Sequence, residues 1–202
     1  MKKSTTALVL MLTLLPALGG CGRVRYPAYY TLNLPAPPDP PVPESVRTSI
    51  AVREFRSPAY LRQGPIVYRT TPEQIGFYEY HRWAVDPRTL VTTSVIDHLR
   101  VSGRFATVSL YDGSPDGDYI FSGRLEKLEE VDSHPGVKVE VAISAQITKV
   151  ATGTTVWSNA VSEVATVSQR SVPAVVSQMN RSLDQAIDKL LSTIPASLAS
   201  SR

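Results

Sequence analysis

The stretch from Val137 to Thr148 alternates apolar and polar positions, and this period of two constrains the fold more than any other feature. Its apolar positions are Val137, Val139, Val141, Ile143, Ala145 and Ile147. Successive side chains of a strand point to opposite faces, so the pattern predicts a strand with one face in a core and the other in water. Thr152-Gly153 then predicts a short turn into an antiparallel partner strand over Thr155–Val167. A hairpin of this kind needs a second layer over its apolar face.

A long amphipathic helix near the end of the chain supplies that layer. Apolar residues recur at helical spacing from Val172 to Ile194, which predicts a helix that docks on the sheet by one face. A shorter helix is predicted earlier in the chain, with Asp86 as its N-cap, Pro87 at its first position and Gly103 at its stop.

The remaining strands are predicted from short segments rich in apolar, aromatic and β-branched residues. These segments are Tyr29–Leu34, Ser49–Phe55, Ile66–Arg69, Ile75–Tyr80, Ala106–Tyr111 and Asp118–Leu125. One helix interrupts this run of strands and the other closes it. The expected fold class is therefore α+β: a single domain whose mixed or mostly antiparallel sheet carries two helices on one face.

The N-terminus has the pattern of a bacterial export signal. Lys2 and Lys3 precede an apolar run that ends at Leu18, which is too short to remain as a membrane-spanning helix. The following Gly19-Gly20-Cys21 completes a resemblance to the lipobox of bacterial lipoproteins, in which the cysteine is acylated and the preceding peptide is removed. Residues 1–20 are the expected signal peptide and Cys21 the expected lipid attachment site, where several acyl chains, palmitate among them, give a stable anchor.

The alternative for this region is an ordinary secretory signal with an incidental cysteine. Cys21 is the only cysteine of the chain, so a disulfide role is excluded. Gly22 stands where aspartate would resemble an inner-membrane retention signal, which favours lipid anchoring at the periplasmic face of the outer membrane.

The expected organisation is a tether over residues 21–28, one domain over residues 29–195 and a flexible C-terminal tail over residues 196–202. Within the domain, the proline-rich segment 35–43 predicts an extended polyproline II conformation. This segment is either a spacer between membrane and domain or a connection that crosses the domain after a first strand. The second interpretation is favoured, because a half-aromatic strand left outside the fold would be adhesive.

Composition and spacing argue against several function classes. Loss of Lys2 and Lys3 leaves a nearly neutral chain, which does not favour nucleic acid as a partner. His81, His98 and His134 are isolated, so no metal site, no cofactor and no catalytic residue are assigned, and an enzyme is not expected. An acidic cluster at Glu126, Glu129, Glu130 and Asp132 is interpreted as a solvated strand end or loop.

A family resemblance is carried by Tyr29-Tyr30-Thr31-Leu32, by Ser57-Pro58-Ala59-Tyr60-Leu61, by Ile66-Val67-Tyr68-Arg69 and by Tyr78-Glu79-Tyr80-His81-Arg82-Trp83-Ala84. In that order and behind a lipobox, they resemble the ABC-type transport auxiliary lipoproteins of the PqiC/YmbA-like group. The resemblance implies a fold similar to the N-terminal domain of TolB. It also implies a non-catalytic partner of mammalian-cell-entry (MCE) domain proteins, which carry lipids between the two membranes and support envelope integrity. Some members form rings, which leaves a homo-oligomer open here.

Aromatic and arginine side chains are concentrated between residues 60 and 83, a composition enriched at protein interfaces. The candidate partner-binding residues are Tyr60, Leu61, Arg62, Tyr68, Arg82 and Trp83. The alternative is that the aromatic members pack the core. Three functions stay open on sequence: the MCE accessory, a TolB-like structural or export lipoprotein such as one serving polysaccharide secretion, and a periplasmic hydrolase.

Overall fold

The computed structural model describes residues 25–34, 46–114, 117–133 and 135–199. Its strands are β1 (Ala28–Tyr30), β2 (Ser49–Val52), β3 (Pro65–Thr71), β4 (Gln74–Trp83), β5 (Thr107–Leu110), β6 (Tyr119–Ser133), β7 (Gly136–Lys149) and β8 (Thr155–Thr166). Its helices are α2 (Pro87–Val101) and α3 (Val172–Ser192), with short 3-10 turns η2 (Ala59–Arg62) and η3 (Ala196–Ala199). No helix among these described ranges is long and apolar enough to cross a membrane.

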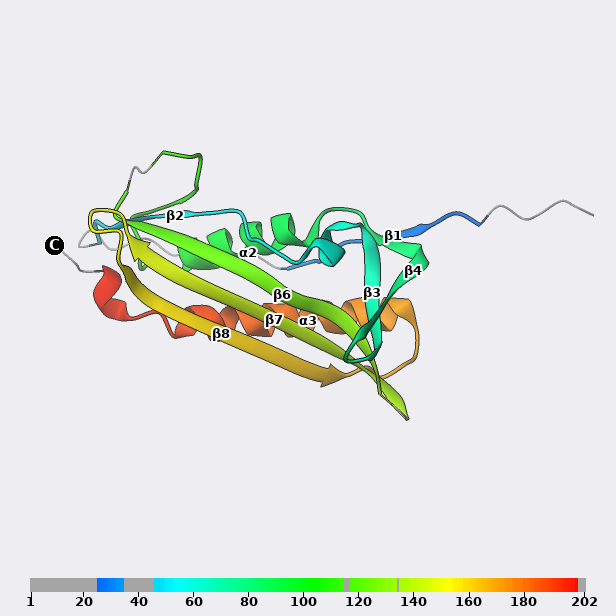
Figure 1. Cartoon of the computed structure of the whole chain (residues 1–202). Coiled ribbons are helices and arrows are strands. Elements are labelled where there is room, and N and C mark those ends of the chain that lie inside the picture. The colour runs from blue at the N-terminus through cyan, green and yellow to red at the C-terminus, as the bar shows by residue number, and fades with distance from the viewer. Residues whose placement is uncertain (1–24, 35–45, 115–116, 134, 200–202) are drawn as a thin grey trace, which may run out of the picture.

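Strand β6 is the axis of the sheet (Figure 1). Along one edge it pairs antiparallel with β7, and β7 pairs antiparallel with β8, which gives the three long strands predicted by the alternating pattern. Along the other edge, β2 runs parallel to the first residues of β6 and β3 runs parallel to its last residues. Strand β5 lies beyond β2, whereas β4 and β1 lie beyond β3. The sheet is therefore mixed, as expected.

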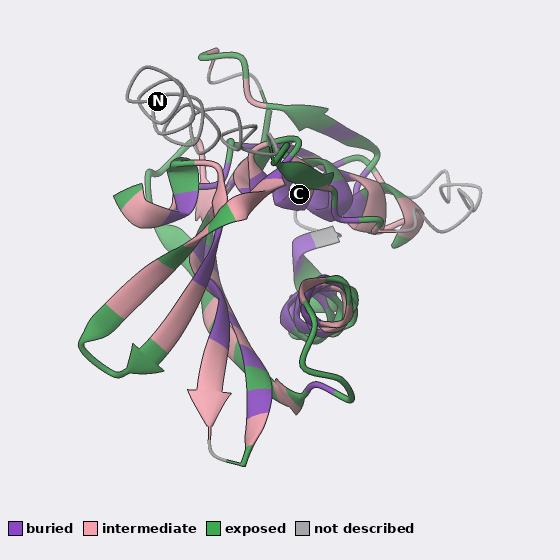
Figure 2. Cartoon of the chain, turned by 90° about the vertical axis from the view of Figure 1, so that its right-hand side faces the viewer, coloured by how far each residue is buried: buried purple, intermediate pink, exposed green. Residues whose placement is uncertain are grey.

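Both helices cover the same face of this sheet. Figure 2 shows the three long strands curving round α3, with their buried residues toward the helix. The apolar residues of β7 predicted to face the core are all buried, and so are those along the inner side of α3, including Met179, Leu183 and Ile187. Helix α2 begins as predicted, because the Asp86 carboxylate accepts a hydrogen bond from the Arg88 backbone amide at 3.0 Å. The predicted α+β fold, with two helices on one face, is confirmed.

A β-bulge in β6 changes which residues face the helices. The register with β7 shifts between Leu125 and Lys127. Before the bulge, Phe121 and Leu125 stand opposite core residues of β7; after it, Leu128 and Glu130 do so. A bulge adds one residue to one strand and so reverses the alternation beyond it. The bulge therefore decides the positions of the acidic residues that follow.

The interpretation of the acidic cluster as a solvated strand end or loop is wrong for two of its members. Glu129 is 0% exposed and Glu130 is 6% exposed, and both lie within β6. Strand β3 pairs with this part of β6 and covers it. The sequence shows the charges but not the neighbouring strand, which comes from some 60 residues earlier in the chain.

The C-terminal boundary also differs from expectation. The predicted tail starts with the ordered turn η3, in which Leu198 is buried against the core.

The proline segment 35–43 lies outside the described residues, but the residues directly before it belong to the domain. Leu32 is buried, and the Asn33 backbone amide donates to the Asn180 side chain of α3 at 2.9 Å. The chain thus enters that segment from the body of the domain.

The segment that follows β2 packs against β6 at Gly123, a residue that has no Cβ. The Phe55 ring lies on Gly123 so closely that a Cβ at this glycine would overlap the ring. We expect Gly123→Ala to lower the free energy of unfolding by about 1–3 kcal/mol, because overpacking forces the neighbouring side chains to shift. Urea unfolding measures this change. Gly136→Ala is the matched control, since its nearest neighbour, the Ser133 carbonyl oxygen, is 3.9 Å from the added Cβ. Equal stability of the two variants would contradict the packing argument.

Candidate functional site

The candidate lipid attachment site, Cys21, lies outside the described residues, so its role stays a prediction. His134 lies outside them as well. The first described residue is Arg25, and β1 follows at Ala28. The end of the domain formed by β1 and β4 is therefore the end next to the expected anchor (Figure 1).

The candidate partner-binding residues do not form one exposed surface. Leu61 and Trp83 are 2% and 5% exposed, and both belong to the hydrophobic core. Their assignment as contact residues is therefore wrong. Leu61 is the inward residue of η2, and Trp83 ends β4 at the edge of the core. An aromatic-rich composition is shared by cores and interfaces, so composition could not separate them.

The other candidates differ in how accessible they are. Tyr60 and Tyr68 are half-buried: the Tyr60 hydroxyl donates to the Glu126 carbonyl oxygen at 3.4 Å, and the Tyr68 ring lies 5.1 Å from that of Tyr78. Arg82 is partly exposed and donates to the Gln63 carbonyl oxygen at 3.2 Å. Arg62 is exposed and forms no side-chain hydrogen bond with the described residues. Arg62 is therefore the most accessible member of the set.

Glu129 is held by a buried ion pair. Both its carboxylate oxygens accept from Arg69, at 2.8 and 3.1 Å, in a bidentate arrangement. Tyr60 covers the pair, and burial, followed by the nearby Glu129 charge, raises the pKa of its phenol. An ionised carboxylate is costly to bury unless it is paired and hydrogen-bonded, as it is here. This carboxylate therefore has a structural partner and is not free to act on a ligand.

Glu130 faces the other side of the sheet, within a group of aromatic side chains. The Tyr78 hydroxyl donates to Glu130 at 2.7 Å, and the Tyr78 ring meets the His81 ring edge-on. His81 in turn has its Nδ1 atom 2.9 Å from the Tyr30 hydroxyl. Burial raises the pKa of Glu130, and burial followed by the bond to Glu130 raises the pKa of Tyr78. The cluster ties β1, β4 and β6 together.

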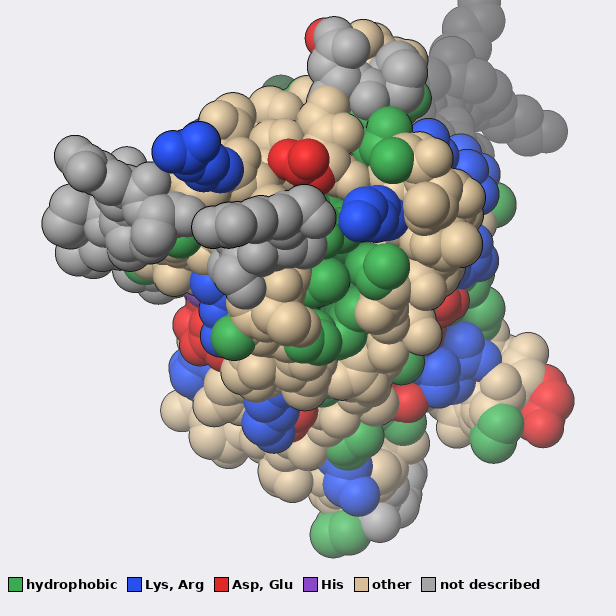
Figure 3. All heavy atoms as spheres, turned by 90° about the vertical axis from the view of Figure 1, so that its left-hand side faces the viewer, with side chains coloured by type: hydrophobic (Ala, Val, Ile, Leu, Met, Phe, Trp, Pro, Cys, Tyr) green, Lys and Arg blue, Asp and Glu red, His purple; other side chains and the backbone are tan. Residues whose placement is uncertain are grey.

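His98, the other described histidine, also joins elements of the fold. His98 lies on α2 with its Nε2 atom 3.3 Å from Asp188 of α3, so it joins the two helices. Within the ranges that the structure describes, no three His, Cys, Asp or Glu side chains gather where they could hold a metal ion. Figure 3 shows basic and acidic side chains interspersed at the end opposite β1, rather than one continuous basic surface.

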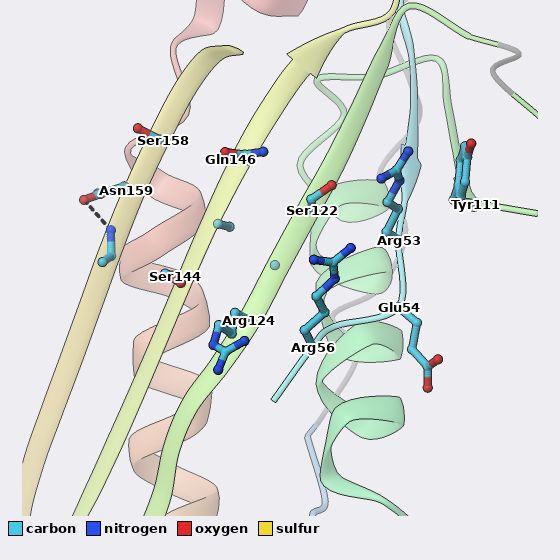
Figure 4. Close-up of a pocket in the computed structure, with 13 residues that line it drawn as sticks. Arg53, Glu54, Arg56, Tyr111, Ser122, Arg124, Ser144, Gln146, Ser158 and Asn159 are labelled. Atoms are coloured by element: carbon cyan, nitrogen blue, oxygen red, sulfur yellow. Dashed lines mark hydrogen bonds between the residues drawn. The ribbon is translucent and has the colours of Figure 1, made fainter. Parts of the chain in front are cut away.

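One hollow of the described surface is a groove on the open face of the sheet, which no helix covers. Its volume is about 1060 Å³. Arg53, Arg56 and Tyr111 line one side, and polar residues of β6, β7 and β8 form its floor (Figure 4). The floor side chains are Ser122, Ser144, Gln146 and Ser158, joined by Arg124. This groove could not be predicted from the sequence, because its residues come from five separate segments.

Sequence comparison identifies the family. Residues 30–190 match the family model of the ABC-type transport auxiliary lipoprotein component. The chain belongs to this family. The match covers the whole sheet from Tyr30 onward and nearly all of α3, so the resemblance predicted from the motifs is confirmed. No curated protein matches the sequence.

Two solved structures share the fold of this chain. Protein XCC0632 from Xanthomonas campestris is 19% identical with a TM-score of 0.71, and the match covers 81% of this chain and 92% of that one. An uncharacterised protein is 14% identical with a TM-score of 0.65, over 84% and 99% of the two chains. A more distant match is the PelC dodecamer from Paraburkholderia phytofirmans, which is 17% identical with a TM-score of 0.48, over 82% of this chain and 96% of that one.

The position of Glu130 in this auxiliary lipoprotein predicts a pH-dependent stability. Its pKa is raised above the ordinary 4.5 on folding, so the linked stability is present below about pH 4.5 and is lost as the pH rises through the folded-state pKa. Glu130→Gln keeps an acceptor for Tyr78 and removes the titration. We expect the variant to gain stability over the wild type as the pH rises from about 4 to 7, measured by urea unfolding.

The control for this experiment is Glu73→Gln, because Glu73 is exposed in the turn between β3 and β4. A stability difference between Glu130→Gln and the wild type that does not change with pH would show that Glu130 keeps its ordinary pKa in the folded protein.

Proposed function

We propose that this chain is an outer-membrane-anchored lipoprotein that serves as a non-catalytic accessory of an MCE/ABC-type lipid transport system. The observation that carries the proposal is the family match over residues 30–190, which begins close behind the lipobox cysteine, Cys21. A domain of this family preceded by such a cysteine is what a periplasmic auxiliary lipoprotein requires. Gly22 after the cysteine supports the outer membrane over the inner one.

The tether between Cys21 and the domain is short, which supports a position of the domain close to the membrane. Arg25 is four residues from Cys21, and four extended residues span at most about 14 Å. The proline segment adds nothing to this reach, because it follows β1 in the chain. A domain held this close to one membrane does not cross the periplasm by itself. A partner that extends from the other membrane has to reach it, which is the role proposed for the MCE protein.

The chemistry of the described residues supports an accessory role over hydrolysis. His81 and His98 contact Tyr30 and Asp188, and Glu129 is paired with Arg69. Hydrolysis needs a nucleophile or an activated water beside a general base. These three groups are engaged in contacts that hold elements together.

The docking surface is proposed at η2 and the adjoining end of β4. It contains fewer residues than the set of candidates predicted from the sequence. Arg62 is its exposed residue, and Arg82 and Tyr60 flank it as partly buried residues. Arginine and tyrosine side chains at the centre of an interface carry a large share of binding energy. Leu61 and Trp83 support this surface from within the core.

The anchor is tested by Cys21→Ala. We expect the wild type to incorporate labelled palmitate and to fractionate with outer membranes, and the variant to do neither, because acyl chains supply the membrane affinity. Density-gradient fractionation separates the inner and outer membranes in the same experiment. Palmitate incorporation by both forms would remove Cys21 as the attachment site, and wild-type protein in the inner-membrane fraction would contradict the outer-membrane placement.

The docking surface is tested by Arg62→Ala in pull-down with the MCE-domain protein of the same organism. We expect a loss of about 1–3 kcal/mol of binding free energy with an unchanged melting temperature, because Arg62 is exposed. Arg181→Ala, on the exposed side of α3, is the control of equal charge. Equal binding by both variants places the docking surface elsewhere, and no binding by the wild type contradicts the MCE partnership.

A further inference from the structure

The groove on the open face contains a pair of like charges that the fold itself does not balance. Arg56 and Arg124 are bridge partners on adjacent parallel segments, so their side chains stand next to each other. Like charges directly opposite one another destabilise a sheet. Arg124 is partly balanced by Glu126 at 2.8 Å, whereas the Arg56 side chain has no hydrogen bond or ion pair with any described residue.

A third arginine extends this positive row. The Arg53 guanidinium lies 4.6 Å from the centre of the Tyr111 ring. This cation–π contact does not use the N–H donors of the guanidinium for a hydrogen bond. Figure 4 shows Arg53, Arg56 and Arg124 along one line beside Ser122, with Glu54 pointing away from that line. The carboxylates near the groove are thus Glu54, which is turned aside, and Glu126, which is bound to Arg124.

A neighbouring hollow of this face shows how basic side chains are balanced there. This hollow, of about 420 Å³, is lined by Arg69 and Lys127. Arg69 is bound to Glu129 at 2.8 Å and Lys127 to Glu140 at 2.7 Å. Arg53 and Arg56 have no such carboxylate partner among the described residues. The large groove therefore carries excess positive charge, whereas these two side chains of the neighbouring hollow are neutralised.

The floor supplies neutral hydrogen-bonding groups beside the arginines. Ser122, Gln146 and Ser158 stand in register across β6, β7 and β8. Their side chains have no hydrogen-bond partner among the described residues, so hydroxyl and amide donors point into the groove unused. An arginine fork binds phosphate oxygens bidentately, and neighbouring hydroxyls complete such sites.

We propose that this groove binds a phosphate group, carried either by a soluble phosphate ester or by a lipid headgroup. Arg56 and Arg124 hold the phosphate oxygens, and Arg53 with the floor side chains contacts the group esterified to it. A bound anion removes the repulsion between the two paired arginines. Binding at the groove is independent of the docking surface at Arg62, which lies on a different element; only the lipid form of the ligand rests on the proposed transport function.

The test uses the mature lipidated chain in a non-ionic detergent, titrated calorimetrically with glycerophosphate and with short-chain phosphatidylglycerol. We expect saturable binding of at least one probe, weakened by added salt. Arg56→Gln should weaken binding roughly ten-fold or more, because a charged hydrogen bond is lost. Arg56→Lys should give an intermediate loss, because lysine keeps the charge but not the fork. Arg181→Gln should bind like the wild type.

The two probes distinguish the sources of the phosphate. Equal affinity for both identifies a site for the phosphate ester alone, and tighter binding of the lipid identifies a headgroup site with contacts to the acyl region. Melting temperatures of the Arg56 variants should equal or exceed that of the wild type. Absence of saturable binding of either probe, or equal weakening by Arg56→Gln and Arg181→Gln, would overturn the proposal. Loss of MCE-protein capture in Arg56→Gln without any phosphate binding would instead make the groove a protein-docking surface.

Discussion

The apolar face that β6, β7 and β8 share with α3 is the contact on which the rest of the structure depends. Each fully buried aliphatic or aromatic side chain contributes about 1.5–3 kcal/mol of transfer free energy, and β6, β7 and α3 supply many of the buried residues of the hydrophobic core. Strand β6 can then accept β2 and β3 along its other edge, because its own position is already fixed by β7 and α3. The shorter strands β1, β4 and β5 are attached through these two.

The bulge in β6 changes which residues of the strand face the helices, so the helix-facing side differs before and after it. Up to Leu125 the helix-facing residues are apolar, and past the bulge the reversed alternation directs Glu130 to the helix side and Glu129 to the open side. Each carboxylate is then matched from the neighbouring strands: Arg69 of β3 binds Glu129, and Tyr78 of β4 binds Glu130. Because an unpaired buried carboxylate is costly, these matches favour one register of β3 and β4 on β6 over its alternatives.

The division of the molecule into two faces also organises its proposed functions. The helix face is filled by the core, whereas the open face keeps its polar side chains accessible and holds the arginine groove (Figure 4). The end formed by β1 and β4 lies next to the expected lipid anchor, and η2 with Arg62 is joined to that end through β3. Membrane attachment, partner docking and phosphate binding can therefore occupy separate parts of one small domain.

The sequence by itself determined the elements whose signal is local. The alternation from Val137 to Thr148, the stripe from Val172 to Ile194 and the Asp86-Pro87 start of α2 each depend on spacing within one segment, and the structure shows all three. The motifs between Tyr29 and Ala84 identified the family for the same reason. Only the tertiary structure decided which aromatic residues are core, which carboxylates are buried and where arginines gather. Glu129 and the Arg56–Arg124 pair owe their environments to segments distant in sequence, and neither the register of those segments nor the bulge in β6 is encoded in any single segment.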